Sequence, residues 1–436
     1  MTSSPSADGS RTIQVEALAR VEGEGAFRVR IEDGRVTDAE FKIFEPPRYF
    51  EALLVGRAYG DAPDVTSRSC GICPIAYIMG ASQAMEQALG LAIPQPIADL
   101  RRLLYCGEWI QSHVLHTHML HAPDFLGLDD AFALAGHDRA LVEAGLAVKK
   151  TGNRIMEVIG GRAVHPVNTR VGGFYAGPAR AAVRELVPEL ERAEELSLAS
   201  LKAFAAFDFP DLETDYLCVA LRHPRDYPIT EGRIVSSAGL DIAIDDFAAH
   251  FEEHHVAHSN ALQGATREGR PYLVGPLARY NLNFDRLPAD IQAAAHESGL
   301  GEICHNPYQS ILVRQVEVIY ACREAARLAR AYEGLEPAFV EVASRHGVGR
   351  GATEAPRGLC YHSYEIDDEG RIVTARIVPP TSQNQRQIER DLVGAVERYQ
   401  TLDDEALQWR CEQTVRNYDP CISCATHYLD VTIERA

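Results

Sequence analysis

The chain has 436 residues, of which 46% are hydrophobic and 24% are charged, and its formal net charge is −19. This composition is typical of a globular protein, and its acidic balance argues against nucleic acids and anionic membrane surfaces as partners. No apolar run approaches the roughly 20 residues of a membrane-spanning helix and no export signal is evident, so we expect a cytoplasmic protein without direct membrane insertion.

The first predicted elements are β-strands, and long helices follow them. From Thr12 to Phe44 apolar and polar residues alternate around an Asp33-Gly34 turn, which predicts a β-hairpin. Apolar residues at three- and four-residue spacings then predict helices, which we expect to pack as a bundle because each buries one apolar face. The predicted helices are Pro74 to Leu89, Ile97 to Leu120, Asp138 to Val158, Ala181 to Phe207 and Ser310 to Tyr332.

The later part of the chain has a mixed pattern. We expect short strands between residues 211 and 287, a second hairpin from Tyr361 to Val378 and a polar helix from Ser382 to Tyr399. A glycine-rich stretch from Gly347 to Gly351 lacks the spacing and the strand–helix context of a dinucleotide-binding loop. Residues Tyr428 to Ala436 alternate and predict a terminal strand. The predicted fold class is therefore α+β and mainly α, with a central helical bundle and peripheral β-hairpins.

Two Cys-x-x-Cys pairs lie near opposite ends of the chain, Cys70 with Cys73 and Cys421 with Cys424. Cysteines three residues apart can direct both sulfur atoms at one point, and Gly71 allows the turn between them, so four converging thiolates indicate a soft metal site. Structural zinc ribbons usually join their pairs over roughly 15–20 residues. Nearly the whole chain separates these two pairs, which favours a reaction centre. A dithiol redox motif is the next alternative, but it leaves the second pair unexplained.

The residues around these cysteines resemble the two signatures of the large subunit of a [NiFe]-hydrogenase, in the order of that family. The first runs from Arg68 to Cys73 and the second from Asp419 to His427. Further similar blocks are spread along the chain at Arg20 to Gly23, Phe41 to Glu45, Gly160 to Arg162, His165-Pro166 and Ala355 to Gly358. The resemblance implies the fold shared by these large subunits and the quinone-site subunit of complex I. It also implies the catalytic subunit of an enzyme that cleaves dihydrogen reversibly into protons and electrons.

The resemblance also implies roles for the cysteines. Cys70, Cys73, Cys421 and Cys424 would all bind nickel, and Cys73 and Cys424 would also bind an iron that carries cyanide and carbon monoxide ligands. Soft thiolates suit nickel, and a terminal thiolate stays basic enough to accept a proton. Cleavage of dihydrogen would place a proton on Cys421, and Glu22 would carry this proton away. From the sequence alone, Glu22 would be a solvated charge at the start of a strand.

Other residues of the family's site have counterparts here. The resemblance implies that Arg357 overhangs the open side of the metals, with Asp419 beside it, where a fixed positive charge can polarise the substrate. Without the resemblance, Arg357 would be interpreted as a surface arginine in a loop. Pro380 and Thr381 match the segment that donates hydrogen bonds to an iron-bound cyanide, although the following Gln383-Asn384-Gln385 departs from the commoner family sequence.

The two ends of the chain match a further family feature. Glu45 and His427 resemble the ligands of a structural divalent ion, usually magnesium, although Glu45 alone would be interpreted as a turn carboxylate. Family members of this kind end at the histidine, so residues 428–436 are implied to be an extension that a maturation protease removes. We expect residues 1–427 to form one globule. Its expected parts are an N-terminal hairpin region at 12–66, a helical core at 67–210, a mixed region at 211–380 and a metal-binding segment at 381–427.

Two positions depart from the family's pattern. Tyr77 stands where a histidine is common, and Ser112 stands where many members have an aspartate, which weakens the acidic group opposite Arg357. The histidines of the same predicted helix as Ser112 do not share one face, so we expect packing or interface roles for them rather than metal ligation. They are His113, His116, His118 and His121.

The four cysteines leave no motif for an iron–sulfur cluster, so electrons require a partner chain, and an iron–sulfur small subunit is implied. The sequence from Cys70 to Tyr77 and the short length are most similar to the cytosolic bidirectional subgroup, which couples hydrogen to NAD(P) through a flavin subunit. Two rival functions remain open at this point. The quinone-site subunit of complex I shares the fold but lacks the cysteines, and a structural zinc protein would give no role to Glu22 or Arg357.

Overall fold

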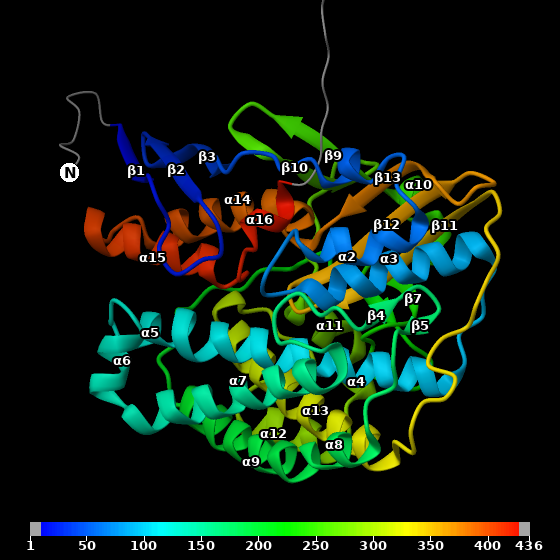
Figure 1. Ribbon diagram of the computed structural model, residues 1–436. Coiled ribbons are helices and arrows are strands. Elements are labelled where there is room, and N and C mark those ends of the chain that lie inside the picture. Colours follow the sequence, from blue (N-terminus) through cyan, green and yellow to red (C-terminus); the bar gives the residue numbers. More distant parts are fainter. Residues whose placement is uncertain (1–9, 427–436) are drawn as a thin grey trace, which may run out of the picture.

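The computed structural model describes residues 10–426 of the chain. In Figure 1, long helices form the lower half of the molecule, and short antiparallel sheets with further helices form the upper half. The architecture is α+β and mainly α, as predicted. Among residues 10–426, every helix is too short or too polar to span a bilayer.

The lower half is a bundle of four long helices. α4 (Gln95–Val114) packs against α7 (Arg139–Gly160), and α13 (Ser310–Ala331) packs against both α4 and α9 (Leu186–Ala205). The apolar spacing predicted all four, because their buried faces build the main hydrophobic core. Shorter helices surround the bundle, namely α5 (Ala122–Phe125), α6 (Ala131–His137), α8 (Arg180–Arg184), α11 (Pro276–Asn283) and α12 (Ala289–Glu297).

Two of the predicted helices are interrupted in the structure. The α-helix expected from Ile97 to Leu120 ends at Val114 and continues as a π-helical segment, Leu115–His121. Apolar spacing identifies a buried face but does not reveal a local change in hydrogen-bond pattern. The helix expected from Ala181 to Phe207 is divided into α8 and α9, because Pro188 has no N–H to donate to the carbonyl four residues earlier.

The N-terminal hairpin is confirmed and carries an additional strand. β2 (Gly25–Glu32) and β3 (Arg35–Ile43) pair around the predicted turn, where Asp33 and Gly34 both have positive φ, and β1 (Arg11–Val15) pairs antiparallel with β2. The inward side chains of this sheet join the main core. Its other neighbour is α14 (Pro380–Tyr399), the predicted polar helix, which packs against β3.

The remaining sheets are small. The expected second hairpin is formed by β12 (Gly358–Ile366) and β13 (Ile372–Val378), and the mixed region contains several short strands. These short strands are β4 (Thr169–Arg170), β5 (Gly173–Phe174), β6 (Val219–Arg222), β7 (Arg233–Ser236), β8 (Asp241–Ile242), β9 (Phe251–Val256) and β10 (Ser259–Thr266). The remaining helices are α1 (Phe50–Leu54), α2 (Ala62–Ser67), α3 (Pro74–Leu89), α10 (Phe247–His250), α15 (Asp404–Arg416) and α16 (Ile422–Ala425).

The glycine-rich stretch from Gly347 to Gly351 forms part of strand β11 (Gly347–Ala355), which pairs with β12. The sequence did not predict this strand. Gly347, Gly349 and Gly351 lie against the backbone of α3. A Cβ atom at these positions would meet a carbonyl oxygen of that helix at 2.2, 1.8 and 2.5 Å, respectively. The glycines therefore allow a strand to lie directly on the helix that follows the first cysteine pair.

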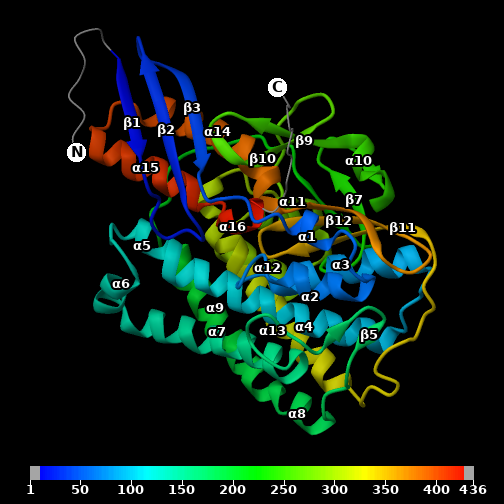
Figure 2. The same cartoon turned by 45° about the horizontal axis from the view of Figure 1, so that its top comes forward.

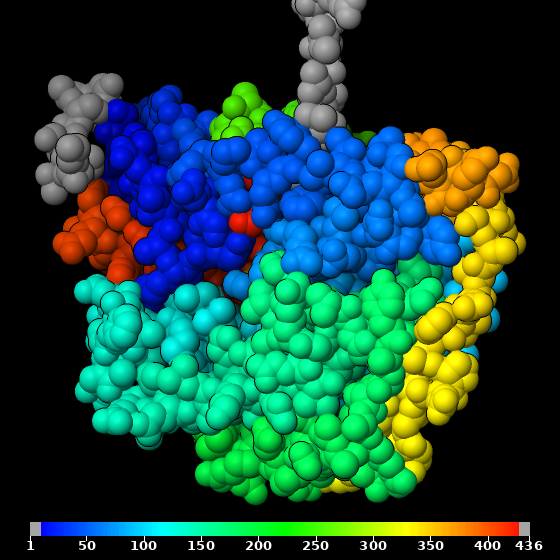
Figure 3. Space-filling view, in the orientation of Figure 1, coloured from blue at the N-terminus to red at the C-terminus, as the bar shows by residue number. Residues whose placement is uncertain are grey.

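The two ends of the described chain meet in the upper half. In Figure 2, α16 lies near the centre of the view, between the N-terminal sheet and the helices α1 and α3. In Figure 3, the C-terminal segment appears as a small red patch surrounded by blue N-terminal residues. The strand predicted at Tyr428 to Ala436 lies outside the described residues.

Candidate metal centre

The first cysteine pair occupies the loop between α2 and α3. Cys73 immediately precedes α3, and Pro74 is the first residue of that helix, where a missing N–H costs nothing. The buried carboxylate of Glu108 accepts hydrogen bonds from the backbone N–H groups of Ile75 and Ala76, at 2.5 and 3.1 Å. Burial raises the pKa of Glu108 well above its usual value. A side chain of the helical bundle thus fixes the start of α3 and the cysteine beside it.

The second pair follows a tight change of direction after α15. Asp419 has a positive φ of 51°, and Cys421 then begins the last turn of the described chain. The N–H of Cys421 donates to Oγ1 of Thr381 at 3.0 Å, and the N–H of Ile422 donates to the carbonyl of Glu22 at 3.0 Å. Residues from the start of the chain and from the start of α14 therefore hold this segment in place.

These two segments bring all four cysteines together. The sulfur atoms of Cys70, Cys73, Cys421 and Cys424 all lie within 4.8 Å of one another, and every one of these residues is buried. Cys70 and Cys421 are 3.3 Å apart at sulfur, and Cys73 and Cys424 are 3.4 Å apart. Within residues 10–426 this is the one group of cysteine, histidine and acidic side chains with metal-binding geometry.

The cluster fits a soft metal ion. Sulfur atoms that bind one ion at about 2.3 Å lie at most about 4.6 Å apart, close to the spacing found here. Burial raises the pKa values of Cys421 and Cys424, and hydrogen bonds from the neighbouring thiols lower that of Cys70. Four thiolates cannot share so small a buried volume without positive charge. A bound cation is therefore required before all four sulfurs can be deprotonated.

Glu22 lies directly beside the cluster, as the resemblance implied. Its Oε2 atom is 3.1 Å from the sulfur of Cys421 and accepts a hydrogen bond from the N–H of Ser423, also at 3.1 Å. Burial raises the pKa of the Glu22 carboxyl, and the negative charge of Cys70 adds to this effect. The carboxyl is thus within reach of a proton on Cys421.

Arg357 is buried rather than at the surface, and only 2% of it is exposed. Its Nε donates to the carbonyl of Asp419 at 2.6 Å, and a terminal nitrogen lies 3.1 Å from the Asp419 carboxylate. Burial alone would lower the pKa of Arg357, but Asp419 and the cysteines outweigh it and raise this pKa. Its Nη1 atom and Oδ2 of Asp419 have no hydrogen-bond partner in the described part of the chain. Buried polar groups of this kind usually face a ligand or water.

The other predicted residues are placed as follows. Pro380 and Thr381 begin α14, and both are buried. Glu45 accepts a hydrogen bond from the hydroxyl of Ser423 at 3.1 Å, so its carboxylate faces the second cysteine segment. His427, the other predicted magnesium ligand, lies outside the described residues. The structure therefore describes one half of this predicted site.

The four histidines of α4 and the π-helical segment do not join the sulfur cluster. His116 bonds to the carbonyl of Arg416, His118 to the hydroxyl of Ser200 and His121 to the side chain of Asn417. His113 lies 2.9 Å from Glu317. All four are buried and pack against neighbouring segments, as predicted.

The two departures from the family's pattern are both buried positions. The Tyr77 ring meets His362 edge-on, with 5.7 Å between ring centroids, and packs in the same cluster as the four cysteines. The hydroxyl groups of Tyr77 and Ser112 have no hydrogen-bond partner among the described residues. Gly80 makes room for His362, because a Cβ there would meet the imidazole at 2.4 Å.

Sequence reasoning missed Arg48, which connects the two cysteine segments. Its guanidinium donates to the carbonyl of Ser69 at 2.5 Å and also contacts the carbonyl of Ser423. Its backbone N–H donates to the carbonyl of Thr426 at 2.6 Å. The sequence carries no signal for this role, since Arg48 follows two prolines at a position without any motif.

The fold and the cluster define a metal-binding protein whose thiolate centre is assembled from two segments 351 residues apart in the chain. Comparison with known proteins identifies its family. The family model described as nickel-dependent hydrogenase matches residues 48–144 and 266–427. The chain belongs to this family.

Relatives of known name extend over almost the whole chain. The sulfhydrogenase 2 subunit alpha of Pyrococcus furiosus is 32% identical over 420 residues, which cover 96% of this chain and 99% of the relative. The NAD-reducing hydrogenase HoxS subunit beta of Cupriavidus necator is 26% identical over 96% of this chain and 95% of its own length. Both names describe subunits of larger hydrogenases.

Solved structures agree with this assignment. An NAD+-reducing [NiFe]-hydrogenase in the H2-reduced state has a TM-score of 0.86 and 27% identity, covering 96% of this chain and 99% of the other. The [NiFeSe]-hydrogenase of Dm. baculatum shares the fold, with a TM-score of 0.79 and 21% identity over 96% of this chain and all of its own chain. The protein is thus a hydrogenase large subunit, an oxidoreductase acting on hydrogen, and neither the complex I-like nor the zinc alternative is favoured.

Proposed function

We propose that the protein cleaves dihydrogen reversibly and heterolytically, and that its electrons pass to an iron–sulfur small subunit and on to NAD(P). The observation that carries the proposal is the buried four-sulfur cluster with the Glu22 carboxyl 3.1 Å from Cys421. The similarity to NAD-reducing hydrogenases supports the choice of acceptor. A cytoplasmic location is consistent with such an acceptor.

In this proposal the four cysteines would hold nickel, and Cys73 and Cys424 would also hold an iron with cyanide and carbon monoxide ligands. When bound, this centre supplies the Lewis acidity that polarises dihydrogen. Pro380 and Thr381, at the start of α14, would line the cyanide ligands of that iron. Glu45, together with His427, holds a magnesium ion that fixes the C-terminal segment.

The protein's own residues then handle the proton. The Cys421 sulfur accepts it, and Glu22 removes it, since their 3.1 Å separation permits direct transfer. Arg357 orients the substrate through its fixed charge, and Asp419 holds the guanidinium in position with two hydrogen bonds. Burial of all four cysteines keeps water away from the reacting atoms.

We also propose where the iron–sulfur subunit binds. Exposed apolar side chains occur on and beside α1 and in the segment around β4 and β5, and Val164 of that segment adjoins the first cysteine loop. They are Tyr49, Leu53, Val55, Val164, Val167 and Tyr175. Val164 is 3.9 Å from where a Cβ of Gly71 would lie, so this surface adjoins the cluster. A partner bound there would lie beside the first cysteine loop, and its apolar contacts would cover these exposed side chains.

The test uses the purified complex. The expected results are one nickel per chain, infrared bands of carbon monoxide and cyanide bound to iron, and hydrogen-dependent reduction of NAD+ or NADP+. Bands without nucleotide reduction would reject the NAD(P) step alone. Absence of the bands in nickel-loaded protein would reject the proposed bimetallic site.

A further inference from the structure

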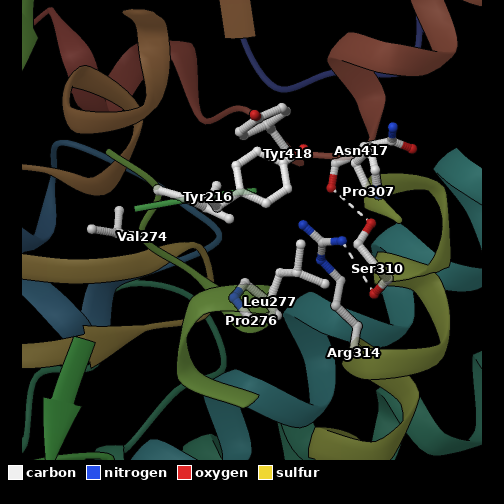
Figure 4. Close-up of a pocket in the computed structure, with 10 residues that line it drawn as sticks. Tyr216, Val274, Pro276, Leu277, Pro307, Ser310, Arg314, Asn417 and Tyr418 are labelled. Atoms are coloured by element: carbon white, nitrogen blue, oxygen red, sulfur yellow. Dashed lines mark hydrogen bonds between the residues drawn. The ribbon is translucent and has the colours of Figure 1, made fainter. Parts of the chain in front are cut away.

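A cavity lies between the N-terminal ends of two helices and the residues that lead to the second cysteine pair (Figure 4). Its free volume is about 20 Å³, which exceeds the roughly 10–15 Å³ that one bound water requires. The lining residues that matter here are Leu277, Ser310, Arg314 and Tyr418. Most of the wall is apolar.

One buried cation faces this cavity. Arg314 is 1% exposed, and Figure 4 shows its guanidinium pointing between Tyr216 and Asn417. Its Nε atom has no hydrogen-bond partner among residues 10–426, and Nη1 makes one long bond, 3.4 Å, to the carbonyl of Ser310. A buried charge without a counter-charge is strongly unfavourable.

The nearest carboxylates, Asp419 and Glu317, act on Arg314 only at longer range, and each bonds to another arginine. Asp419 is bonded to Arg357, and both oxygens of Glu317 are bonded to Arg279. No ion pair in the described part of the chain includes Arg314. Burial lowers the pKa of Arg314 to about 10, in keeping with a guanidinium that lacks a close partner. No carboxylate of the described chain therefore bonds to Arg314, although Asp419 and Glu317 partly offset its charge from a distance.

Two helices add to the positive character of the cavity. α13, of 22 residues, begins at Ser310, and α11 begins at Pro276, and both of these residues line the cavity. The first-turn N–H groups of a helix have no acceptor within that helix, and its N-terminus carries a partial positive charge. The guanidinium and both helix ends therefore favour the same kind of ligand.

We propose that this cavity is a binding site for a small monovalent anion of the size of chloride, held by the Arg314 guanidinium. The limited volume excludes phosphate and larger carboxylates, and the apolar wall favours an ion that needs few donors. The anion neutralises Arg314 from within the cavity. Neutralised in this way, Arg314 repels the Arg357 guanidinium less.

The direct test is crystallographic and uses the complete hydrogenase complex. Crystals grown with sodium bromide in place of chloride are expected to show a strong anomalous peak in the cavity, within contact distance of the Arg314 guanidinium. Waters refined at full occupancy in that position, with no anomalous signal there, would overturn the proposal.

A second test measures the linkage between halide and stability. At constant ionic strength, replacing gluconate by 100 mM chloride is expected to raise the melting temperature of the complex by about 2–4 °C, which corresponds to saturable binding to the folded state. Arg314→Met, which keeps the side-chain length but removes the charge, should abolish this shift. The control is Arg323→Met on the same helix, a residue paired with Glu194 and Asp290, which should retain the shift.

Loss of the chloride-dependent shift in Arg314→Met alone would support the proposed anion site. An equal chloride-dependent shift in Arg314→Met would contradict the proposal, because the ion would then bind elsewhere. If that variant does not assemble, the bromide experiment on the native complex decides. Neither experiment depends on turnover, so failure of the proposed anion site leaves the proposed hydrogenase reaction untouched.

Discussion

Glu22 contacts the second cysteine pair in two ways, through its backbone and through its side chain. Its backbone carbonyl accepts from Ile422, and its carboxylate meets both Ser423 and the Cys421 sulfur. The backbone contact positions the second cysteine pair, whereas the carboxylate can exchange a proton with it. These two roles can be separated by substitution, because a change of side chain leaves the backbone contact in place.

Glu22→Gln should therefore lose activity without losing the metal. Glutamine preserves the shape of the side chain but cannot carry a proton, so we expect hydrogen turnover and hydrogen–deuterium exchange to fall about 100-fold or more. Nickel content and melting temperature should stay close to those of the native protein. Glu24→Gln, at an exposed neighbouring position, is the control and should retain full activity. Near-native exchange in Glu22→Gln would exclude Glu22 as the proton carrier.

Arg48 provides a second prediction at this scale, because it bonds to a carbonyl in each cysteine segment. Arg48→Met removes both charge-assisted contacts and should destabilise the protein by about 2–3 kcal/mol, measured by urea denaturation. Nickel occupancy should fall as well, since the two segments lose their connection. Arg57→Met is the matched control, because Arg57 is exposed and its side chain donates to the Leu53 carbonyl one helical turn earlier. Equal effects of the two substitutions would argue against the connecting role of Arg48.

The elements differ in how readily the sequence predicts them. The bundle helices were predicted because a buried stripe requires apolar residues at regular spacing, and α3 was predicted at its observed bounds. Strand β11 was missed because its glycines are depleted in ordinary strands. These glycines are needed because β11 contacts α3, which lies more than 250 residues earlier in the chain. The local sequence does not reveal this contact.

Gly349→Ala tests the contact between β11 and α3. A methyl group there would lie 1.8 Å from the Ala84 carbonyl, so the strand and helix must separate. We expect a loss of about 2–3 kcal/mol in the free energy of unfolding, or failure to fold. Gly394→Ala, in the middle of α14 with no atom within 4 Å of the new methyl group, should instead be neutral or stabilise the protein by up to about 1 kcal/mol. Similar stabilities of the two variants would contradict close packing at β11.

The π-helical segment predicts how stability depends on pH. Burial lowers the pKa of His118 to about 4 in the folded protein, whereas an unfolded chain has a histidine pKa near 6.5. The unfolded state therefore binds a proton first as pH falls. The stability that His118 contributes is complete above about pH 6.5 and is lost progressively towards pH 4.

The measurement is urea denaturation at pH 7.5 and at pH 5. His118→Gln can still bond to Ser200 but does not titrate. Between these pH values its free energy of unfolding should therefore fall by about 1–2 kcal/mol less than that of the native protein. The control is His137→Gln, at an exposed position in α6. Its stability should change between the two pH values as much as that of the native protein does. An unchanged pH dependence in His118→Gln would show that His118 does not titrate in this way.

At the scale of the whole molecule, the site is made by bringing together segments that the sequence separates widely. The cysteine spacing and the family signatures predicted the cluster, Glu22 and the Arg357–Asp419 pair, because these residues carry recognisable motifs. Glu108 and Arg48 were not predicted, since their roles depend on where the bundle and the N-terminal loop meet the cluster. Motifs identify the chemistry of a site, whereas its supports become visible only in three dimensions.

The predicted removal of the C-terminal extension concerns the length of the mature chain. Residues 428–436 and His427 lie outside the described part of the chain, so the expectation rests on the resemblance. We expect nickel-loaded, active protein to end at His427, and protein from nickel-starved cells to keep all 436 residues. Intact-mass spectrometry of both preparations separates the two forms. A full-length mass in the active, nickel-loaded protein would contradict cleavage.

The joining of the second cysteine pair to the N-terminal segment has a consequence for the order of assembly. A ribosome makes Glu22, Arg48 and the first pair early, and Cys421 and Cys424 follow 351 residues after Cys70 and Cys73. Until then the first pair has no partner sulfurs, and the position that α16 will occupy is open to other molecules. Metal delivery can therefore begin before the second pair is made, and the segment that carries Cys421 and Cys424 then closes the site.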